Sequence, residues 1–206
     1  MNRIKWIFFD VGSTLIDETE CYNHRIRDAI AGTDITFEEF NEKRIFFAKQ
    51  NLKGDIEALK FFELTKTPWH FEDEKPYEEA EAVLNALCER GYNIGVIANQ
   101  ALGTEKRLEN WGLMKYIYIV VASTEEDVAK PDSEIFLRAL KRAECLPENA
   151  VMIGDRIDND IEPANKLGMK TIWVRQGFGI YQQPANNFQI ADYTVENLRD
   201  ILVILK

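Results

Sequence analysis

The sequence predicts a doubly wound α/β fold, in which helices cover both faces of a parallel sheet. Five short apolar runs are rich in β-branched and aromatic residues and do not alternate strictly between apolar and polar positions. Helix-like stretches separate most of these runs, which is the pattern of a parallel sheet with right-handed crossovers and strands buried on both faces. The runs are residues 4–9, 93–98, 116–121, 150–154 and 170–174.

Residues 18–75 break this alternation, because strand patterns vanish and helical patterns follow one another. Residues 67–76 are interpreted as a linker that returns to the core. The predicted organisation is a Rossmann-like core, formed by residues 1–17 and 76–206, and a small helical cap over 18–75, inserted after the first strand. The predicted cap helices are roughly residues 18–31, 36–51 and 55–65.

Glycines and capping residues bound the predicted core helices. Pro76 suits the first turn of one helix, which Gly91 ends, and Thr104 fits the N-cap of the next, which Gly112 ends. Residues 181–193 look loop-like, and a final strand or turn and a short helix are expected to complete the fold. The predicted core helices are residues 76–91, 104–112, 131–146 and 159–168.

Composition narrows the class of partner. The chain has 206 residues, of which 46% are hydrophobic, and a formal net charge of −10. A uniformly acidic surface repels phosphate backbones and anionic bilayers, so neither nucleic acid nor a membrane is an expected partner. No run approaches the ~20 apolar residues of a membrane span. Whether the protein is a monomer or a homodimer stays open, because an aromatic-rich cap is compatible with both.

The cysteines and the first residues favour a cytoplasmic protein. Cys21, Cys88 and Cys145 have neither metal-ligand nor redox-motif spacing, and three is an odd number for a disulfide framework. The opening residues MNRIKWIFFD have no long apolar segment followed by a small-residue cleavage site. We therefore expect a reduced protein without a signal peptide.

Polar residues follow the predicted strands at their carboxyl ends, where an open parallel sheet gathers its ligands. Because neighbouring strands end at one edge of the sheet, carboxylates after the first and fourth runs are expected to meet, with a lysine nearby. The residues concerned are Asp10, Gly12, Ser13, Thr14, Asn99, Lys130, Asp155, Asp158 and Asp160.

Adjacent carboxylates repel each other unless a cation neutralises them, and oxygen ligands without histidine or cysteine favour Mg²⁺. An ion between Asp10 and Asp155 attracts a phosphoryl group. Asp10 can then attack phosphorus to form an aspartyl phosphate, while Lys130 balances the charge on the phosphoryl oxygens. Backbone N–H groups of the loop 10–14 would help to hold the phosphate.

The chain resembles hydrolases of the haloacid dehalogenase (HAD) superfamily, most of which are phosphatases with an aspartate nucleophile. The first, third and fourth motifs of that family are matched by FFDVGSTL, AKPDSEIF and MIGDRIDNDIEPANKLG, and the second is matched poorly by VIANQ. The order and spacing of the motifs are specific, and they cover nearly the whole chain. The position of the cap resembles subfamily I, whose helical C1 cap follows the first motif.

The resemblance implies a role for each polar residue and Mg²⁺ as the cofactor. Asp10 is the implied nucleophile and Lys130 the catalytic lysine. The implied metal ligands are Asp10, Asp155 and the backbone carbonyl of Gly12. Asp160, or alternatively Asp158, would orient the metal shell. The implied phosphate-binding residues are Gly12, Ser13, Thr14 and Asn99.

Two positions depart from the family pattern. Gly12 stands where related phosphatases carry a second aspartate, which protonates the leaving oxygen and later deprotonates water, and Ala98 stands where they carry a serine or threonine. Three explanations are open: a leaving group that needs no proton, such as that of an acyl phosphate; an acid from elsewhere in the chain; or loss of efficient catalysis. The candidate acids are Asp17, Glu18, Glu20 and His24.

The expected function is Mg²⁺-dependent hydrolysis of a small phosphorylated metabolite through an aspartyl phosphate, with altered or weak activity because of Gly12 and Ala98. The alternative is a catalytically impaired HAD-fold protein that binds a ligand or a partner. A phosphoacceptor regulatory domain is disfavoured, because the acceptor of such a domain normally lies on a central strand without an insert after it. Dehalogenation is disfavoured by the spacing of Asp155 and Asp160, which indicates a metal.

Overall fold

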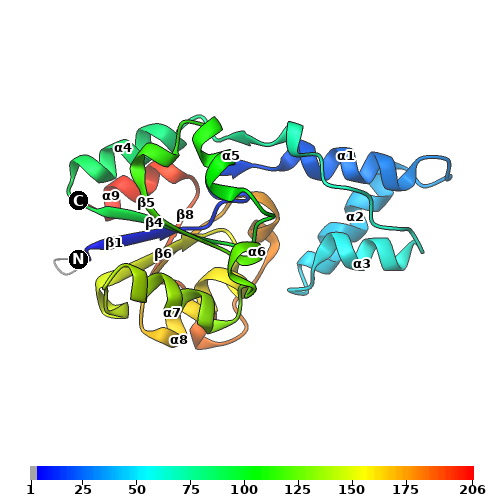
Figure 1. Cartoon of the computed structure of the whole chain (residues 1–206). Helices are drawn as coiled ribbons and strands as arrows, with labels where there is room; N and C mark the ends of the chain where they lie inside the picture. Colours follow the sequence, from blue (N-terminus) through cyan, green and yellow to red (C-terminus); the bar gives the residue numbers. More distant parts are fainter. Residues whose placement is uncertain (1–3) are drawn as a thin grey trace.

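The computed structural model describes residues 4–206, and within them six strands form one parallel sheet in the order β5-β4-β1-β6-β7-β8 (Figure 1). All five predicted strands are confirmed, and β8 follows them. Strand β1 lies between β4 and β6, pairing Phe9 with Val96 on one side and with Ile153 on the other. The strands are β1 (Trp6–Phe9), β4 (Asn93–Ala98), β5 (Ile117–Ala122), β6 (Ala150–Gly154), β7 (Lys170–Val174) and β8 (Tyr193–Val195).

Helices cover both faces of the sheet, so the doubly wound fold is confirmed. Figure 1 shows α4 and α9 on one side of the sheet and α7 and α8 on the other. Alternate residues of β1 serve the two layers: Ile7 and Phe9 pack toward α4 and α9, whereas Phe8 packs toward α7 and α8. The core helices are α4 (Ala80–Glu89), α5 (Thr104–Asn110), α6 (Ser123–Glu126), α7 (Ser133–Arg142), α8 (Glu162–Leu167) and α9 (Ile201–Ile204).

Gly95 in β4 lets Phe8 pack against the neighbouring strand. A Cβ atom at residue 95 would lie 2.7 Å from the Phe8 ring. We expect Gly95→Ala to lower the free energy of unfolding by about 1–3 kcal/mol, the usual cost of overpacking a core. Urea titration followed by circular dichroism measures this loss. The double variant Gly95→Ala/Phe8→Leu should recover part of it, and an unchanged midpoint in the single variant would show that the close approach is unimportant.

Three helices form the cap, which extends beyond the carboxyl end of β1, away from both termini of the chain (Figure 1). They are α1 (Thr19–Ile30), α2 (Phe37–Ala48) and α3 (Gly54–Phe61), close to the predicted stretches. Thr36 and Glu39 form a capping box at the start of α2. The cap has a core of its own around Ile26, Phe40 and Leu59.

A two-stranded antiparallel sheet at the base of the cap corrects the predicted start of the helix at 76–91. Strand β2 (Ile16–Asp17) pairs with β3 (Lys75–Pro76), and the N–H of Tyr77 donates to the carbonyl of Leu15. Pro76 therefore belongs to a strand, and α4 begins at Ala80. Since each strand has only two residues, the sequence has no alternating pattern that would predict this strand pair.

The predicted N-cap of α5 and the predicted start of the helix at 159–168 are also corrected. Gly103, not Thr104, is the N-cap of α5, because the Thr104 hydroxyl donates to the carbonyl of Ala101. A π-type helical turn over Ile157–Ile161 precedes α8, so helical structure begins before residue 159.

Within residues 4–206, no helix combines the length and the apolar character that crossing a bilayer demands.

Candidate active site

Four of the predicted site residues meet at the carboxyl ends of the strands. Asp10 directly follows β1 and Asp155 directly follows β6, while Lys130 precedes α7 and Asp160 lies in the turn before α8. All four are buried and line a cavity of about 190 Å³ beneath the cap. The fold thus brings the candidate nucleophile Asp10, the ammonium group of Lys130 and two further carboxylates together from separate elements.

Lys130 lies between two carboxylates. Its Nζ atom is 2.6 Å from Asp10 Oδ1 and 2.6 Å from Asp160 Oδ1. Burial disfavours the charged form of Lys130, but the two carboxylates outweigh this cost and raise its pKa above the ordinary value. Lys130 therefore remains an ammonium ion that fixes one oxygen of Asp10.

Asp160 reaches Lys130 because Gly154 leaves room for it. A Cβ atom at residue 154 would collide with the carboxylate of Asp160, whose Oδ2 atom also accepts the N–H of Arg156 at 3.0 Å. Burial, opposed by Lys130, raises the pKa of Asp160 to about 6. Both oxygens of Asp160 thus have protein partners, which suits a positioning group better than a metal ligand.

Asp155 has the environment of a metal ligand. Its side chain is buried and has no hydrogen-bond donor within residues 4–206. Burial and the neighbouring carboxylates of Asp10 and Asp160 raise its pKa well above the usual range. Ligand oxygens of these three residues lie within 4.8 Å of one another. One lysine cannot neutralise three carboxylates, so a divalent cation held by oxygen ligands fits the site.

Two of the predicted residues, Asp158 and Asn99, make contacts that differ from expectation. Asp158 pairs with Arg156, at 2.6 Å, and with Gln182 rather than with Lys130. The amide of Asn99 donates to the Lys130 carbonyl and accepts the Lys130 N–H, so Asn99 holds the lysine backbone.

Thr14 and Ser13 differ in their access to the cavity. Thr14, predicted to bind phosphate, is completely buried and does not line the cavity, and its hydroxyl has no partner within residues 4–206. Ser13 has a positive φ of 55° and lines the cavity together with Gly12. A positive φ is costly for a residue other than glycine and often occurs at functional sites.

The two predicted positioning aspartates can be separated by experiment. Asp160→Asn weakens the fixation of the buried ammonium of Lys130, so we expect lower stability, by about 3–5 kcal/mol at most, and a lower turnover number. Asp158→Asn is the matched control, since Asp158 pairs with Arg156 instead of Lys130 and does not line the cavity. Its effect on turnover is expected to be much smaller. Equal losses in the two variants would contradict the assignment of Asp160 to Lys130.

Glu18 fills the space beside Gly12. A Cβ atom at residue 12 would lie 2.5 Å from Glu18 Oε1, and Ser13 Oγ donates to Glu18 Oε2 at 3.1 Å. Glu18 precedes α1 and lines the same cavity as Asp10. The loop thus places a carboxyl group from the start of the cap where a side chain at residue 12 would otherwise project.

Burial, reinforced by the charge of Asp10, raises the pKa of Glu18 to about 8. A carboxyl group of this kind carries a proton at neutral pH. The other three candidate acids do not line the cavity: Asp17 accepts the N–H of Thr19, Glu20 bonds Asn23, and His24 bonds Asp73. Of the four, Glu18 alone has both the place and the protonation state of a proton donor.

The segment after β7 is a part of the site that the sequence did not reveal. A Cβ atom at Gly177 would lie 2.6 Å from Ser13 Cβ, and one at Gly179 would collide with the backbone of Asp155. Between these glycines, Phe178 lines the cavity and stacks on Arg44 of the cap, whose guanidinium carbon is 3.3 Å from the ring centroid. A signal was present in the sequence: two glycines, Gly177 and Gly179, come shortly after a predicted strand.

Residues 7–174 match the family of haloacid dehalogenase-like hydrolases. The chain belongs to this family. It is 30% identical to the glyceraldehyde 3-phosphate phosphatase of Methanopyrus kandleri, over 98% of this chain and 97% of that protein. It is 26% identical to the pyrophosphatase PpaX of Listeria monocytogenes, over 99% and 97% respectively.

A solved structure with the same fold is that of a predicted phosphoglycolate phosphatase from Haemophilus somnus, which has a TM-score of 0.74, 18% identity and full coverage of both chains. The predicted resemblance to HAD hydrolases is confirmed, and the chain is a hydrolase of the phosphatase class.

Proposed function

We propose that this HAD hydrolase is a Mg²⁺-dependent phosphatase that acts on a small phosphorylated metabolite through an aspartyl phosphate on Asp10. The observation that carries the proposal is the placement of Asp10 in the cavity, with Lys130 Nζ 2.6 Å from one of its oxygens and the buried Asp155 beside it. Phosphatases of this family are generally metal-dependent. Oxygen ligands without histidine or cysteine favour Mg²⁺ among the common ions.

The site would hold the ion through Asp10, Asp155 and the backbone carbonyl of Gly12. When bound, Mg²⁺ neutralises charge on the carboxylates and the phosphoryl group. An oxygen of Asp10 attacks phosphorus, and the bond between phosphorus and the leaving oxygen breaks. Lys130, held by Asp160, stays charged and balances the negative charge that gathers at the phosphoryl oxygens.

Glu18 is the proton-transfer group in this proposal. As the leaving oxygen departs it takes the proton of Glu18, which becomes a carboxylate. The same carboxylate then accepts a proton from the water that attacks the aspartyl phosphate, and phosphate leaves as Asp10 is restored. Proton transfer by a positioned side chain contributes about 10²–10⁴-fold to the rate. Glu18 would supply this contribution, which the glycine at residue 12 cannot.

The size of the cavity and the names of the relatives support a short-chain substrate. A cavity of about 190 Å³ suits a molecule of few carbons, and the cap contributes Tyr22 to its wall. Relatives of nearly equal length are named glyceraldehyde 3-phosphate phosphatases. We therefore propose that the substrate is a phosphate monoester of triose size. We also propose that the enzyme is cytoplasmic.

Phosphate release tests the proposal. It is measured with and without Mg²⁺ on glyceraldehyde 3-phosphate, on a simple alkyl phosphate and on acetyl phosphate, whose acetate leaves without a proton. Mg²⁺-dependent turnover of all three is expected. No turnover of any of them would contradict the proposal and favour the alternative of an impaired binding protein. Turnover of acetyl phosphate alone would keep Asp10 as the nucleophile but remove Glu18 as the acid.

A further inference from the structure

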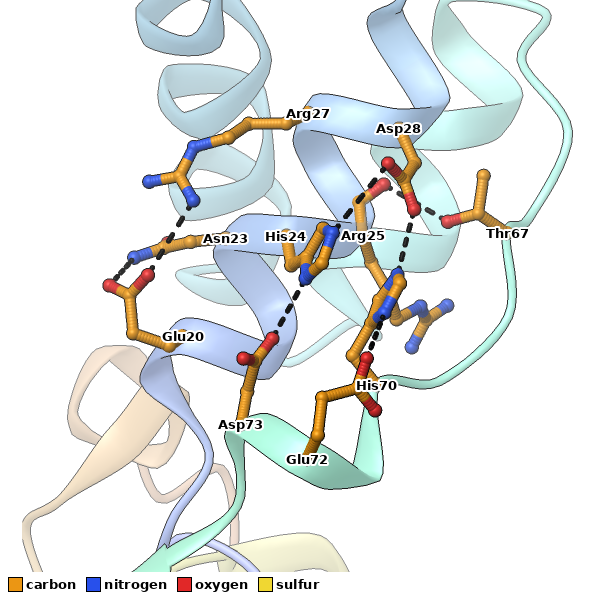
Figure 2. Close-up of polar contacts among 10 residues, drawn as sticks. All are labelled: Glu20, Asn23, His24, Arg25, Arg27, Asp28, Thr67, His70, Glu72 and Asp73. Carbon is orange, nitrogen blue, oxygen red and sulfur yellow. Dashed lines mark hydrogen bonds and ion pairs between the residues drawn. The ribbon is translucent and has the colours of Figure 1, made fainter.

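A second cluster of titratable side chains lies on the cap, apart from the cavity at Asp10 (Figure 2). His24 of α1 and His70 of the returning segment stack face to face, with ring centroids 3.4 Å apart and an angle of 8° between the planes. Three carboxylates contact the two rings. They belong to Asp28, Glu72 and Asp73.

The two edges of the stacked rings face different carboxylates. On the Nδ1 edge, His24 Nδ1 is 2.9 Å from Asp73 Oδ2, and His70 Nδ1 is 3.1 Å from Glu72 Oε1. On the Nε2 edge, one aspartate serves both rings: Asp28 Oδ2 is 2.7 Å from His70 Nε2, and Asp28 Oδ1 is 3.9 Å from His24 Nε2. Each imidazole therefore has a carboxylate at both nitrogens.

The cluster has more negative charge than its own residues can neutralise. Three carboxylates face only two imidazole rings, so even two charged rings would leave an excess of negative charge. Figure 2 shows the side chain of Arg27 directed toward Glu20, away from the rings. A cation is therefore favoured between the rings and the carboxylates.

We infer that this cluster is a binding site for one divalent transition-metal ion of the Zn²⁺ type. Imidazole nitrogen together with carboxylate oxygen is a donor set that suits Zn²⁺, in contrast to the all-oxygen site around Asp10. Ligand atoms of His24, His70 and Glu72 lie within 4.8 Å of one another. The ligands are His24, His70 and the carboxylate of Glu72. Asp73, whose Oδ2 atom is 2.9 Å from His24 Nδ1, supplies a further carboxylate beside them.

Asp28 lies on the Nε2 edge of the rings, opposite the proposed ligand atoms. A histidine that binds a metal through one nitrogen usually donates its other N–H to a carboxylate, which fixes the ring and makes it a better ligand. Asp28 occupies that place for His70, at 2.7 Å from Nε2, and lies 3.9 Å from His24 Nε2, beyond hydrogen-bond distance. An ion lies close to the plane of each ring that binds it, so one ring must turn from the stacked position. His24, whose side chain is 40% exposed, has the space to do so.

The site joins the two ends of the cap. His24 and Asp28 belong to the first cap helix, whereas His70, Glu72 and Asp73 belong to the segment that leads back to β3. An ion bound here links the segments through which the cap enters and leaves the core. We expect it to hold the cap together without contacting the substrate.

Titration of the whole protein with Zn²⁺ in millimolar Mg²⁺, followed by calorimetry, tests the inference, and Co²⁺ absorption reports on nitrogen ligands. One site is expected in the wild type, weakened by at least about tenfold in His24→Asn and in Glu72→Gln, and by about 10–100-fold in Asp28→Asn. Glu72 is 69% exposed, so its substitution tests binding without endangering the fold. Glu20→Gln, on the same helix but paired with Arg27, is the control and should bind as the wild type does.

Zn²⁺ affinity that is unchanged in both His24→Asn and Glu72→Gln would overturn the inference. So would Zn²⁺ binding that disappears in Asp155→Asn alone, because the ion would then lie at the active site. Neither outcome depends on turnover, so the cap site and the proposed phosphatase activity can fail separately.

Discussion

Asp10→Asn is expected to abolish Mg²⁺-dependent phosphate release, with a loss of about 10⁴-fold or more. An amide is a poor nucleophile toward phosphorus and cannot form the aspartyl phosphate, and losing a nucleophile is among the most costly changes to a covalent mechanism. The same substitution removes one carboxylate from the pair that holds Lys130. Single-turnover assays on acetyl phosphate, whose acetate leaves without a proton, isolate the attack by Asp10 from the proton transfers of Glu18.

The matched control is Asp17→Asn. Asp17 lies in β2, near Asp10 in the chain, but accepts the N–H of Thr19 and does not line the cavity. It should retain most of the wild-type rate. Acid quenching of the wild type during turnover, followed by mass spectrometry of the peptide that contains Asp10, should detect the covalent phosphate. Full turnover by Asp10→Asn would contradict the mechanism.

The sheet could be predicted from the sequence because its strands are long enough to carry a pattern. Runs of apolar residues at β1, β4 and β6 are buried on both faces, and Gly91 and Gly112 follow α4 and α5 with a positive φ. Strands β2 and β3 could not be predicted, since two residues carry no periodicity and Pro76 also suits a helix start. Their pairing depends on how the cap returns, which is a tertiary property.

The site could be predicted only as far as strand ends determine it. Asp10 and Asp155 follow paired strands, and this placed them side by side, whereas Asp158 and Asp160 lie two residues apart in a turn whose geometry decides which one faces Lys130. The role of Asn99 was likewise hidden, because its hydrogen bonds to the backbone of Lys130 join segments far apart in the chain.

The proton donor, like the positioning aspartate, could not be chosen from the sequence alone. The sequence supplied four candidate acids near Gly12, but their directions depend on the bend between the loop and α1. The positive φ at Ser13 and the absence of a side chain at Gly12 let the chain fold Glu18 back over the loop. Gly12 is therefore understood as the residue that makes room for Glu18, a relation that spacing alone does not reveal.

Glu18→Gln should slow formation of the aspartyl phosphate from an alkyl phosphate by about 10²–10⁴-fold and leave its formation from acetyl phosphate much less affected, because only the alkoxide needs a proton to leave. Hydrolysis of the aspartyl phosphate, for which Glu18 is the base, should slow equally with both substrates. The wild type should also lose activity toward the alkyl phosphate as pH rises through about 8, since the raised pKa of Glu18 keeps its proton below that value and releases it above. Glu18→Gln should lack this alkaline decline. Pre-steady-state and pH-rate measurements on both substrates check these expectations.

Moving the carboxyl group from residue 18 to residue 12 tests whether the position of this group, rather than the residue that carries it, determines proton transfer. Gly12→Asp alone should be poorly active, because its new Cβ would lie 2.5 Å from Glu18 Oε1 and one carboxylate must move. In the double variant Gly12→Asp/Glu18→Ala that conflict is gone, and the aspartate projects into the space that Glu18 vacates. The double variant should therefore recover at least about tenfold in rate on the alkyl phosphate over Glu18→Ala, a part of the contribution of a positioned acid. If it recovers nothing while both variants still hydrolyse acetyl phosphate, the carboxyl group beside Gly12 does not transfer the proton, and the acid must come from the substrate or from water.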